Sequence, residues 1–226
     1  MELVPVILSL KLSAVTTVLL FVFCLPAASL LTSLNKHYRN LLDALSFLPM
    51  VLPPTVLGFY MLLLFSPYNF IGGFLEDSLG VRFVFNFWGM VLASCVFSFP
   101  LMLLPIKNGF ENIDQSLVEA SYTLGKSKLQ TLFHIILPNI KSYLALGALT
   151  TFAHTMGEFG VVLMVGGNIP GETKVLSIAL FEKVEELDYA SAHIYSLVLV
   201  GISLLIIILI LALNGKMKRE VSYDFG

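Results

Sequence analysis

Two ionisable side chains stand one helical turn apart inside a long apolar run, His154 and Glu158. A carboxylate and an imidazole at this spacing could relay a proton, hold a cation, or share a hydrogen bond. No third ligand is evident, so the pair argues against a metal site. The structural alternative is that Glu158 pairs with an arginine at the membrane interface or caps a neighbouring helix. Neither interpretation requires catalysis, and no cluster of His, Asp or Cys has catalytic spacing.

A second pattern could bind phosphate. Ala120, followed after four residues by Gly125-Lys126-Ser127, fits the loosest form of a phosphate-binding loop, with Ala in place of the first Gly. Such a loop lies between a strand and a helix, whereas residues 108–124 have a helical pattern. The intervening residues also lack the glycine that would let several N–H groups surround a phosphate. We therefore expect no nucleotide binding by this chain.

The elements that carry these residues are set by composition. Hydrophobic residues make up 57% of the chain and charged residues 12%, which is too apolar for a water-soluble domain and predicts an all-α polytopic membrane protein. A net charge of −2 without a basic run argues against a nucleic-acid partner. Helices need about 20 apolar residues to cross a bilayer. Five segments meet this criterion: 12–31, 41–65, 88–106, 142–166 and 194–213.

These spans form a single predicted transmembrane domain over residues 1–226. A sixth element would have to lie at 66–86 or 172–190. Lysine and arginine favour the cytoplasmic side of a membrane, so their distribution predicts an outer N-terminus. Lys11 is left out because its side chain can reach the outer interface. The predicted inner residues are Lys36, Arg39, Lys107, Lys126, Lys128, Lys141, Lys216, Lys218 and Arg219; the outer ones are Arg82, Lys174 and Lys183. The loop 107–141 and the C-terminus are thus predicted to be cytoplasmic.

The second span contains three prolines between residues 48 and 55. Each removes a backbone donor, and freed carbonyl groups cannot face lipid, so the segment is expected to face a cavity or a water-filled path. A packing kink without a transport role is the alternative. Candidate path or gate residues are Pro53, Pro54, Thr55, His154 and Glu158. Candidates for a neutral polar lining are Thr55, Ser94, Ser98, Thr150, Thr151 and Thr155.

The loop 107–141 has the pattern of two short amphipathic helices. Apolar residues recur at helical spacing before and after Gly125, and Ser127 is placed to cap the second helix, which we expect Pro138 to end. The stripe of the second helix comprises Leu129, Leu132, Phe133 and Ile136. A hairpin lying on the lipid surface is the alternative.

The spacing in this loop resembles the cytoplasmic docking loop of ABC-importer permeases, EAA-x3-G-x9-I-x-LP. The matching residues are Glu119, Ala120, Ser121, Gly125, Ile135, Leu137 and Pro138. Ser121 stands where the family commonly has Ala, and this exchange of one small residue for another should preserve docking. The resemblance implies a type I ABC-importer permease fold with five to six transmembrane helices.

Further motifs resemble the molybdate-importer permeases over residues 8–210. They are Leu-Pro-Met-Val-Leu-Pro-Pro at 48–54, Gly-Glu-Phe-Gly at 157–160, and an outer turn with Gly167, Asn168, Pro170 and Gly171. Sulfate and tungstate permeases are near relatives with similar motifs, and their separation from molybdate rests mainly on this turn. We therefore keep import of sulfate, thiosulfate or tungstate as an alternative to molybdate.

The resemblance implies a bacterial or archaeal cytoplasmic-membrane assembly. Its members would be a homodimer of this permease, two subunits that bind ATP and Mg²⁺, and an extracytoplasmic oxyanion-binding protein meeting residues 167–190. Few cationic side chains lie within the spans, so we expect a low-affinity gate with selectivity in the binding protein. The remaining alternative is an ion-coupled secondary transporter using Glu158 and His154, although such folds show paired repeats and more spans.

Overall fold

The part of the chain that the structure describes consists of helices joined by turns and loops, without strands. The structure is a computed structural model that describes residues 2–223, with side chains described as far as Ala212 except that of Leu79. The side chains of Lys216, Lys218 and Arg219 therefore lie outside the described ones. The helices are α1 (Val4–Ser33), α2 (Lys36–Val51), α3 (Pro54–Phe65), α4 (Phe70–Leu79), α5 (Phe87–Glu111), α6 (Gln115–Thr123), α7 (Lys128–Thr131), the π-helical turn η1 (Leu132–Ile136), α8 (Leu137–Asn139), α9 (Lys141–Gly157), α10 (Gly160–Gly166), α11 (Leu176–Glu185) and α12 (Tyr189–Tyr223). This confirms the predicted all-α class.

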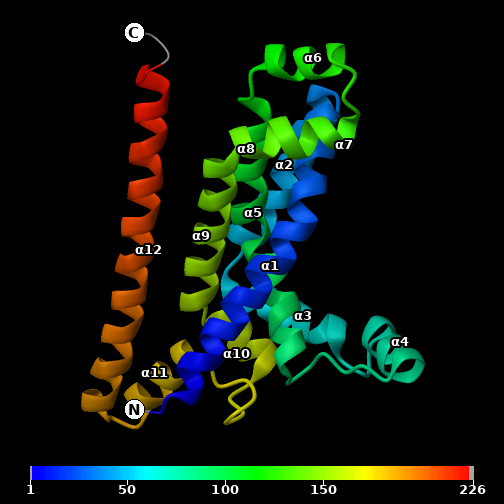
Figure 1. The fold of residues 1–226 in the computed structure, drawn as a ribbon. Helices are drawn as coiled ribbons and strands as arrows, with labels where there is room; N and C mark the ends of the chain where they lie inside the picture. The colour runs from blue at the N-terminus through cyan, green and yellow to red at the C-terminus, as the bar shows by residue number, and fades with distance from the viewer. Residues whose placement is uncertain (1, 224–226) are drawn as a thin grey trace.

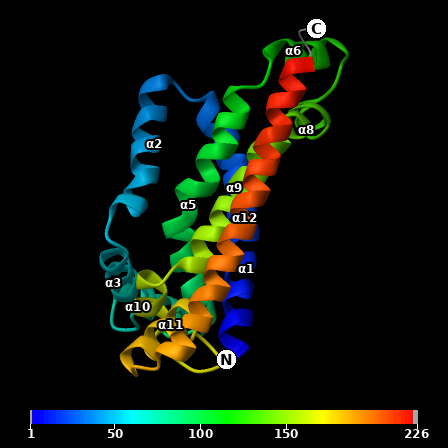
Figure 2. The same ribbon diagram turned by 90° about the vertical axis from the view of Figure 1, so that its left-hand side faces the viewer.

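Three helices are long and apolar enough to cross a membrane: α1, α5 and the segment Tyr189–Ala212 of α12. Two helix pairs pass the same test but are bent at a short break: α2 with α3 by 100°, and the helix over residues 128–139 with α9 by 71°. In Figures 1 and 2, α1, α5, α9 and α12 run lengthwise along the molecule, and α2 lies beside them over the half toward α6. The described chain thus has up to five candidate crossings.

Two of the expected spans differ from single straight helices. Residues 41–65 divide at Pro53, where α3 turns away from α2, and residues 142–166 divide at Glu158. The third expected span continues beyond residue 106 as far as Glu111, so Lys107 lies inside α5 and not in the loop. The helix tolerates this lysine because Asp43 of α2 pairs with it.

The intervals that might have held a sixth crossing contain α4 and α11. Each is 10 residues long, whereas a helix needs about 20 residues to cross a bilayer. Both lie with α3 and α10 at the end of the bundle where the chain begins, hereafter the N-terminal end (Figure 1). Helices α6 to α8 lie at the opposite end, hereafter the loop end, toward which α12 extends.

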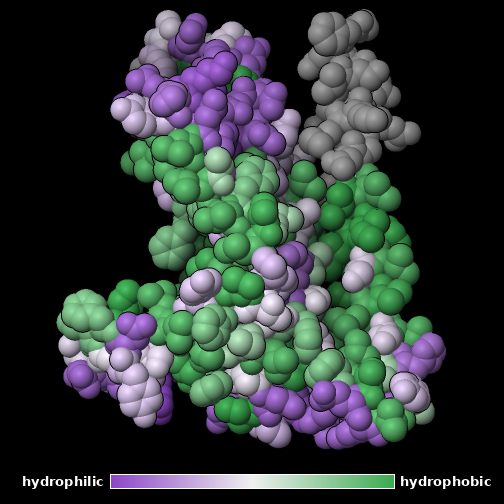
Figure 3. Space-filling view, turned by 180° about the vertical axis from the view of Figure 1, so that it is seen from behind, coloured by the Kyte–Doolittle hydropathy of each residue, from purple (hydrophilic) through white to green (hydrophobic). Residues whose placement is uncertain are grey.

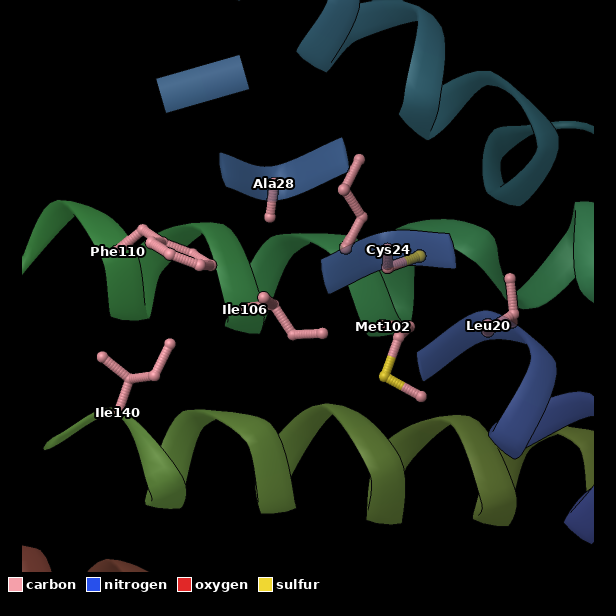
Figure 4. Packing of buried hydrophobic residues seen from close by; sticks show 8 residues of the cluster. Leu20, Cys24, Ala28, Met102, Ile106, Phe110 and Ile140 are labelled. Carbon is pink, nitrogen blue, oxygen red and sulfur yellow. The ribbon is translucent and has the colours of Figure 1, made fainter. Parts of the chain in front are cut away.

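Helices α1, α5 and α9 form the centre of the bundle. Cys24 and Ala28 of α1 face Met102 and Ile106 of α5, and Ile140 closes the cluster beside α9 (Figure 4). The small side chains of Cys24 and Ala28 are fully buried and let α1 approach α5 closely. Cys24 is a free thiol, consistent with its predicted identity as a small buried hydrophobe.

The surface has the distribution of polarity that a bilayer requires. Figure 3 shows a broad apolar band between a hydrophilic cap over the loop end and hydrophilic residues at the N-terminal end. Many large apolar side chains along α12 are exposed, among them Leu204, Leu205 and Ile208. A water-soluble protein rarely exposes so continuous an apolar area, so lipid is the expected surrounding of this band.

Candidate functional site

Both ends of α6, the first helix of the loop, are set by individual residues beside them. Asp114 caps α6 by accepting a 2.9 Å hydrogen bond from the N–H of Ser116. At the other end Gly125 has φ +76°, a left-handed conformation that favours glycine, and Lys126 N–H donates to the carbonyl of Ser121 at 3.1 Å. The chain thereby reverses direction directly after α6.

The second helix of the loop is fastened to the first. Ser127 and Gln130 form a reciprocal capping box that starts α7. The hydroxyl groups of Ser121 on α6 and Thr131 on α7 are 2.8 Å apart, and both side chains are buried. The two helices therefore form one braced unit (Figure 1). Ser121, where the resembled motif has Ala, contributes the hydrogen bond that alanine could not make.

Pro138 does not end the second helix as predicted. Helices α7, η1 and α8 run on continuously through Pro138 to Asn139, and the 71° bend follows at Ile140. Proline has no N–H to donate, and the turn before it widens, so that Leu137 N–H bonds to the carbonyl of Leu132, five residues back. Ile135 of the resembled motif is half-buried in this wide turn.

The expected apolar stripe of the second helix is divided between two directions. Leu132 and Ile136 pack on the central cluster, whereas Leu129 and Phe133 are 67% and 61% exposed. Leu124, beside the Gly125 turn, is 79% exposed. Apolar side chains presented by a braced, otherwise hydrophilic unit are typical of a protein-binding surface.

The loose phosphate-loop pattern lies on this same helix and turn. Glu119 and Ala120 are exposed on α6, and the N–H groups that follow are already used: Leu124 donates to Ala120 and Gly125 to Tyr122. No strand precedes the pattern within residues 2–223. The backbone therefore offers no cradle of free N–H groups to a phosphate.

The two broken spans meet at the N-terminal end. A Cβ atom added to Gly160, the first residue of α10, would lie 2.9 Å from the Cβ of Pro54 in α3. Gly58 of α3 faces α10 equally closely. Pro53, Pro54 and Thr55 are exposed beside this contact. The breaks in α2–α3 and α9–α10 thus form a joint of tightly packed backbones.

Glu158 lies between α9 and α10 with its side chain turned inward. The residue is only 5% exposed, and neither carboxyl oxygen has a hydrogen-bond partner. Ser94 of α5 lies close to the carboxyl group but does not meet hydrogen-bond geometry with it. The main-chain carbonyl of Glu158 accepts a 2.5 Å hydrogen bond from Ser177 of α11. The backbone of Glu158 is therefore fixed by a hydrogen bond, whereas its carboxyl group has no hydrogen-bond partner.

His154 and Glu158 do not share the hydrogen bond that was one of the possibilities at their spacing. The Nδ1 atom of His154 is 3.0 Å from the hydroxyl of Ser98 on α5, and its ring lies 4.8 Å from that of Phe97. Because α9 ends at Gly157, the helical spacing that would have aligned the two side chains is not continued. Within the described residues no group of three or more metal-ligating side chains occurs.

The predicted polar lining is mostly inside the bundle. Its buried members are Ser94, Ser98, Thr151 and Thr155. Thr150 instead bonds to main-chain carbonyl groups, including that of Leu101 on α5. These side chains therefore lie between packed helices: Ser98 Oγ is 3.2 Å from the hydroxyl of Thr155, whereas the hydroxyl groups of Ser94 and Thr151 have no hydrogen-bond partner among the described residues.

The predicted outer turn, residues 167–171, contains two glycines in the left-handed backbone conformation. Gly167 and Gly171 have φ of +69° and +80°. Pro170 is exposed between them, and the Asn168 amide donates to a carboxylate oxygen of Glu182 on α11 at 3.2 Å. The turn lies at the N-terminal end, opposite α6 (Figure 1).

Glu182 joins the outer turn to α11. Its carboxylate also accepts a 2.7 Å charge-assisted hydrogen bond from Lys174. This bond, with the amide of Asn168, lowers the pKa of Glu182. The turn is therefore braced at neutral pH, with the carboxylate ionised.

Sequence reasoning missed a group of four charged residues at the loop end. Arg39 and Asp43 on α2 meet Lys107 and Glu111 on α5. Each pair is spaced i, i+4 on its own helix, a pattern that was readable. The pairing between the helices was not readable, since 64 residues separate Asp43 from Lys107.

Comparison with known proteins identifies the family to which this chain belongs. The model of a family described as binding-protein-dependent transport system inner membrane component matches residues 10–222. The molybdenum transport system permease protein ModB of Azotobacter vinelandii is 40% identical over 193 residues, which are 85% of each chain. The sulfate transport system permease protein CysT of Salmonella typhimurium is 33% identical over 200 residues, covering 88% of this chain and 72% of that protein.

The fold has a solved counterpart as well. A bacterial ABC transporter involved in the import of the polysaccharide alginate contains a chain that superposes with a TM-score of 0.71 over 96% of this chain and 79% of that one. Identity in that comparison is 16%, so the similarity concerns the fold alone.

Proposed function

Because the chain belongs to the family of binding-protein-dependent transport system inner membrane components, we propose that it is the membrane-spanning permease of an ATP-driven importer of molybdate. The observation that carries the substrate is the 40% identity to a molybdenum permease over 85% of both chains. The Gly-Glu-Phe-Gly segment and the 167–171 turn, which resemble molybdate permeases, support it.

The orientation we propose puts the loop end in the cytoplasm and the N-terminal end outside. The positively charged residues of the loop support it, since Lys126, Lys128 and Lys141 all lie at that end. The chain is thus a multi-pass protein of the bacterial or archaeal cytoplasmic membrane.

The braced unit of α6 to α8, hereafter the docking unit, is the proposed docking site for a separate ATP-binding subunit. Its stiffness supports this role, because a hydrogen bond between Ser121 and Thr131 lets force on one helix move the other. Exposed Leu124, Leu129 and Phe133 supply an apolar contact. Two permease copies would each hold one such subunit, and those subunits would bind ATP and Mg²⁺.

At the opposite end, the turn 167–171 and α11 are the proposed contact for an extracytoplasmic oxyanion-binding protein. The bracing of Asn168 and Lys174 by Glu182 supports a preformed surface there. Closing of the ATP-binding subunits would move the docking units, and the joint between α3 and α10 would rearrange to open the path. Few cationic side chains lie within the spans, so this path would hold the oxyanion weakly.

The test is uptake of radiolabelled molybdate by cells lacking this gene, complemented with the wild type or with Gly125→Pro. Proline cannot adopt the positive φ of Gly125 and has no N–H to donate to Tyr122, so the variant should reach the membrane but fail to restore uptake. Equal uptake with both versions would contradict docking through this loop.

Sulfate, thiosulfate or tungstate import is the second candidate, supported by the identity to a sulfate permease. Recovery of sulfate uptake without recovery of molybdate uptake would select it. Coupling to an ion gradient through Glu158 predicts instead that uptake collapses with the proton gradient and survives deletion of the ATPase gene.

A further inference from the structure

The four charged residues at the loop end, hereafter the ion cluster, join α2 to α5 in an alternating chain. Arg39 Nη1 lies 3.2 Å from Glu111 Oε1, and Lys107 Nζ lies 3.7 Å from the same oxygen. Lys107 also forms an ion pair with Asp43. Two positive and two negative charges thus balance one another across the two helices.

The ion cluster is too buried to be an ordinary surface feature. The side chain of Lys107 is 8% exposed and that of Asp43 is 22% exposed. Charges removed from water in this way commonly add little net stability, although removing one partner is costly. One carboxylate oxygen of Asp43 is buried without any hydrogen-bond partner, so the arrangement is not optimised for stability alone.

Away from the ion cluster, α2 stands apart from the bundle. A cavity of about 710 Å³ separates the middle of α2 from α1 and α5, and its lining is almost entirely apolar. Residues on its walls include Phe23, Leu42, Leu45, Pro49 and Phe99. Figure 2 shows the separation between the α2 and α5 ribbons. Helix α2 can therefore shift sideways without breaking a close-packed contact with α5 there.

The two ends of α2 are attached to parts with different proposed roles. Its far end leads through Pro53 into the joint of α3 with α10. Its near end is held by the ion cluster to Glu111, the last residue of α5. Only three residues further along, Asp114 caps α6 of the docking unit.

From this placement we propose that the ion cluster transmits movement of the docking unit to α2, and through α2 to the joint at Pro53 and Pro54. This inference rests on the proposed function, since it assumes that an ATP-binding subunit moves α6 to α8. Arg39, Asp43, Lys107 and Glu111 act as positioning residues for the coupling of ATP hydrolysis to transport. They contact neither ATP nor the oxyanion in this scheme.

The experiment compares the whole transporter, reconstituted in vesicles with its ATP-binding subunits and binding protein, in wild-type and variant form. The main variant carries Asp43→Asn together with Lys107→Met, which removes one charge of each sign and leaves no unpaired charge at either position. The matched control carries Glu76→Gln with Arg82→Met, which removes an ion pair at the opposite end. Molybdate uptake and ATP hydrolysis are measured on the same vesicles.

We expect the amount of molybdate transported per ATP to fall about tenfold in the main variant, a size typical of coupling between sites, while hydrolysis continues. The control variant should keep the wild-type ratio. Exchanging all four charges, with Arg39→Glu, Asp43→Lys, Lys107→Asp and Glu111→Arg together, keeps the alternation of charge and should restore most of the ratio because the attraction between α2 and α5 returns. Should the main variant not assemble, Glu111→Gln, at a more exposed position, is expected to lower the ratio by a smaller factor.

An unchanged ratio in an assembled main variant, or in Glu111→Gln, overturns the proposal. A parallel fall of uptake and hydrolysis also overturns it, because the ion cluster would then serve docking and not transmission. Failure of wild-type vesicles to take up molybdate is a different result. It rejects the substrate assignment, and the same ratio is then measured with sulfate.

Discussion

The hydroxyl of Ser177 on α11 donates a 2.5 Å hydrogen bond to the main-chain carbonyl of Glu158, at the break between α9 and α10. Both residues are buried. A helix at the N-terminal end of the bundle thus satisfies a carbonyl that the interrupted helix leaves without its usual partner.

The first prediction concerns this bond. Replacing Ser177 by Ala leaves the Glu158 carbonyl buried and unpaired, which costs about 1–3 kcal/mol. The purified permease complex should therefore unfold at a lower temperature in a thermal melt. Ser196→Ala is the control, because its hydroxyl bonds to a carbonyl within α12. Equal melting of the two variants would contradict a bracing role for Ser177.

The second prediction concerns the Glu158 side chain. Its buried carboxyl group has no hydrogen-bond partner to stabilise a negative charge, so we expect it to act as a neutral group that fills its site. Glu158→Gln, which keeps the shape, should retain uptake at every pH tested, whereas Glu158→Ala should lose most of it. Loss of uptake in Glu158→Gln at normal membrane levels would instead support proton relay or cation binding.

The third prediction concerns the bracing of the docking unit. Ser121→Ala removes the bond to Thr131 at a cost of about 1 kcal/mol, and because the replacement is small the ATP-binding subunit should still co-purify. Ser121→Leu forces a large side chain between α6 and α7 and should abolish co-purification. Retention of the ATP-binding subunit by Ser121→Leu would show that the packing of these two helices is not needed for docking.

The fourth prediction concerns the joint of the broken spans. Gly160→Ala puts a methyl group 2.9 Å from Pro54, and such overpacking costs about 1–3 kcal/mol. Uptake and melting temperature should both fall. Gly157→Ala is a close control three residues away, since nothing lies within 4 Å of its added carbon. Identical uptake and identical melting temperatures in the two variants would contradict this prediction, because the joint would then be loose enough to accept the methyl group.

What the sequence predicted well was decided locally. The apolar runs predicted where the long apolar helices lie, and Gly125 with Ser127 predicted the helix–turn–helix of the loop, because left-handed turns and caps depend on residues a few positions apart. The three prolines indicated a break in the second span. They could not indicate its 100° angle, which depends on how α3 packs against Gly160.

The errors arose where distant contacts decided the outcome. Lys107 was expected in a loop because a lone lysine commonly ends an apolar span, but Asp43 lets the helix continue past it. A hydrogen bond between His154 and Glu158 was one of the possibilities at their spacing in a continuous helix, but α9 ends at Gly157. The ion cluster remained hidden because its bonds join residues far apart in the chain.

The π-helical turn η1 carries a consequence for the ancestry of the loop. Such a turn is an α-helix with one residue too many, and it is relieved by deleting one. Because the extra residue is accommodated within this one wide turn, deleting a single residue within Leu132–Ile136 should restore regular α-helix and leave the orientation of the flanking helices nearly unchanged. Leu129 would then keep its exposed direction, and Ile136 its place in the core. A difference of one residue at this turn is therefore absorbed locally, and relatives with a turn one residue shorter should present the same face of α7.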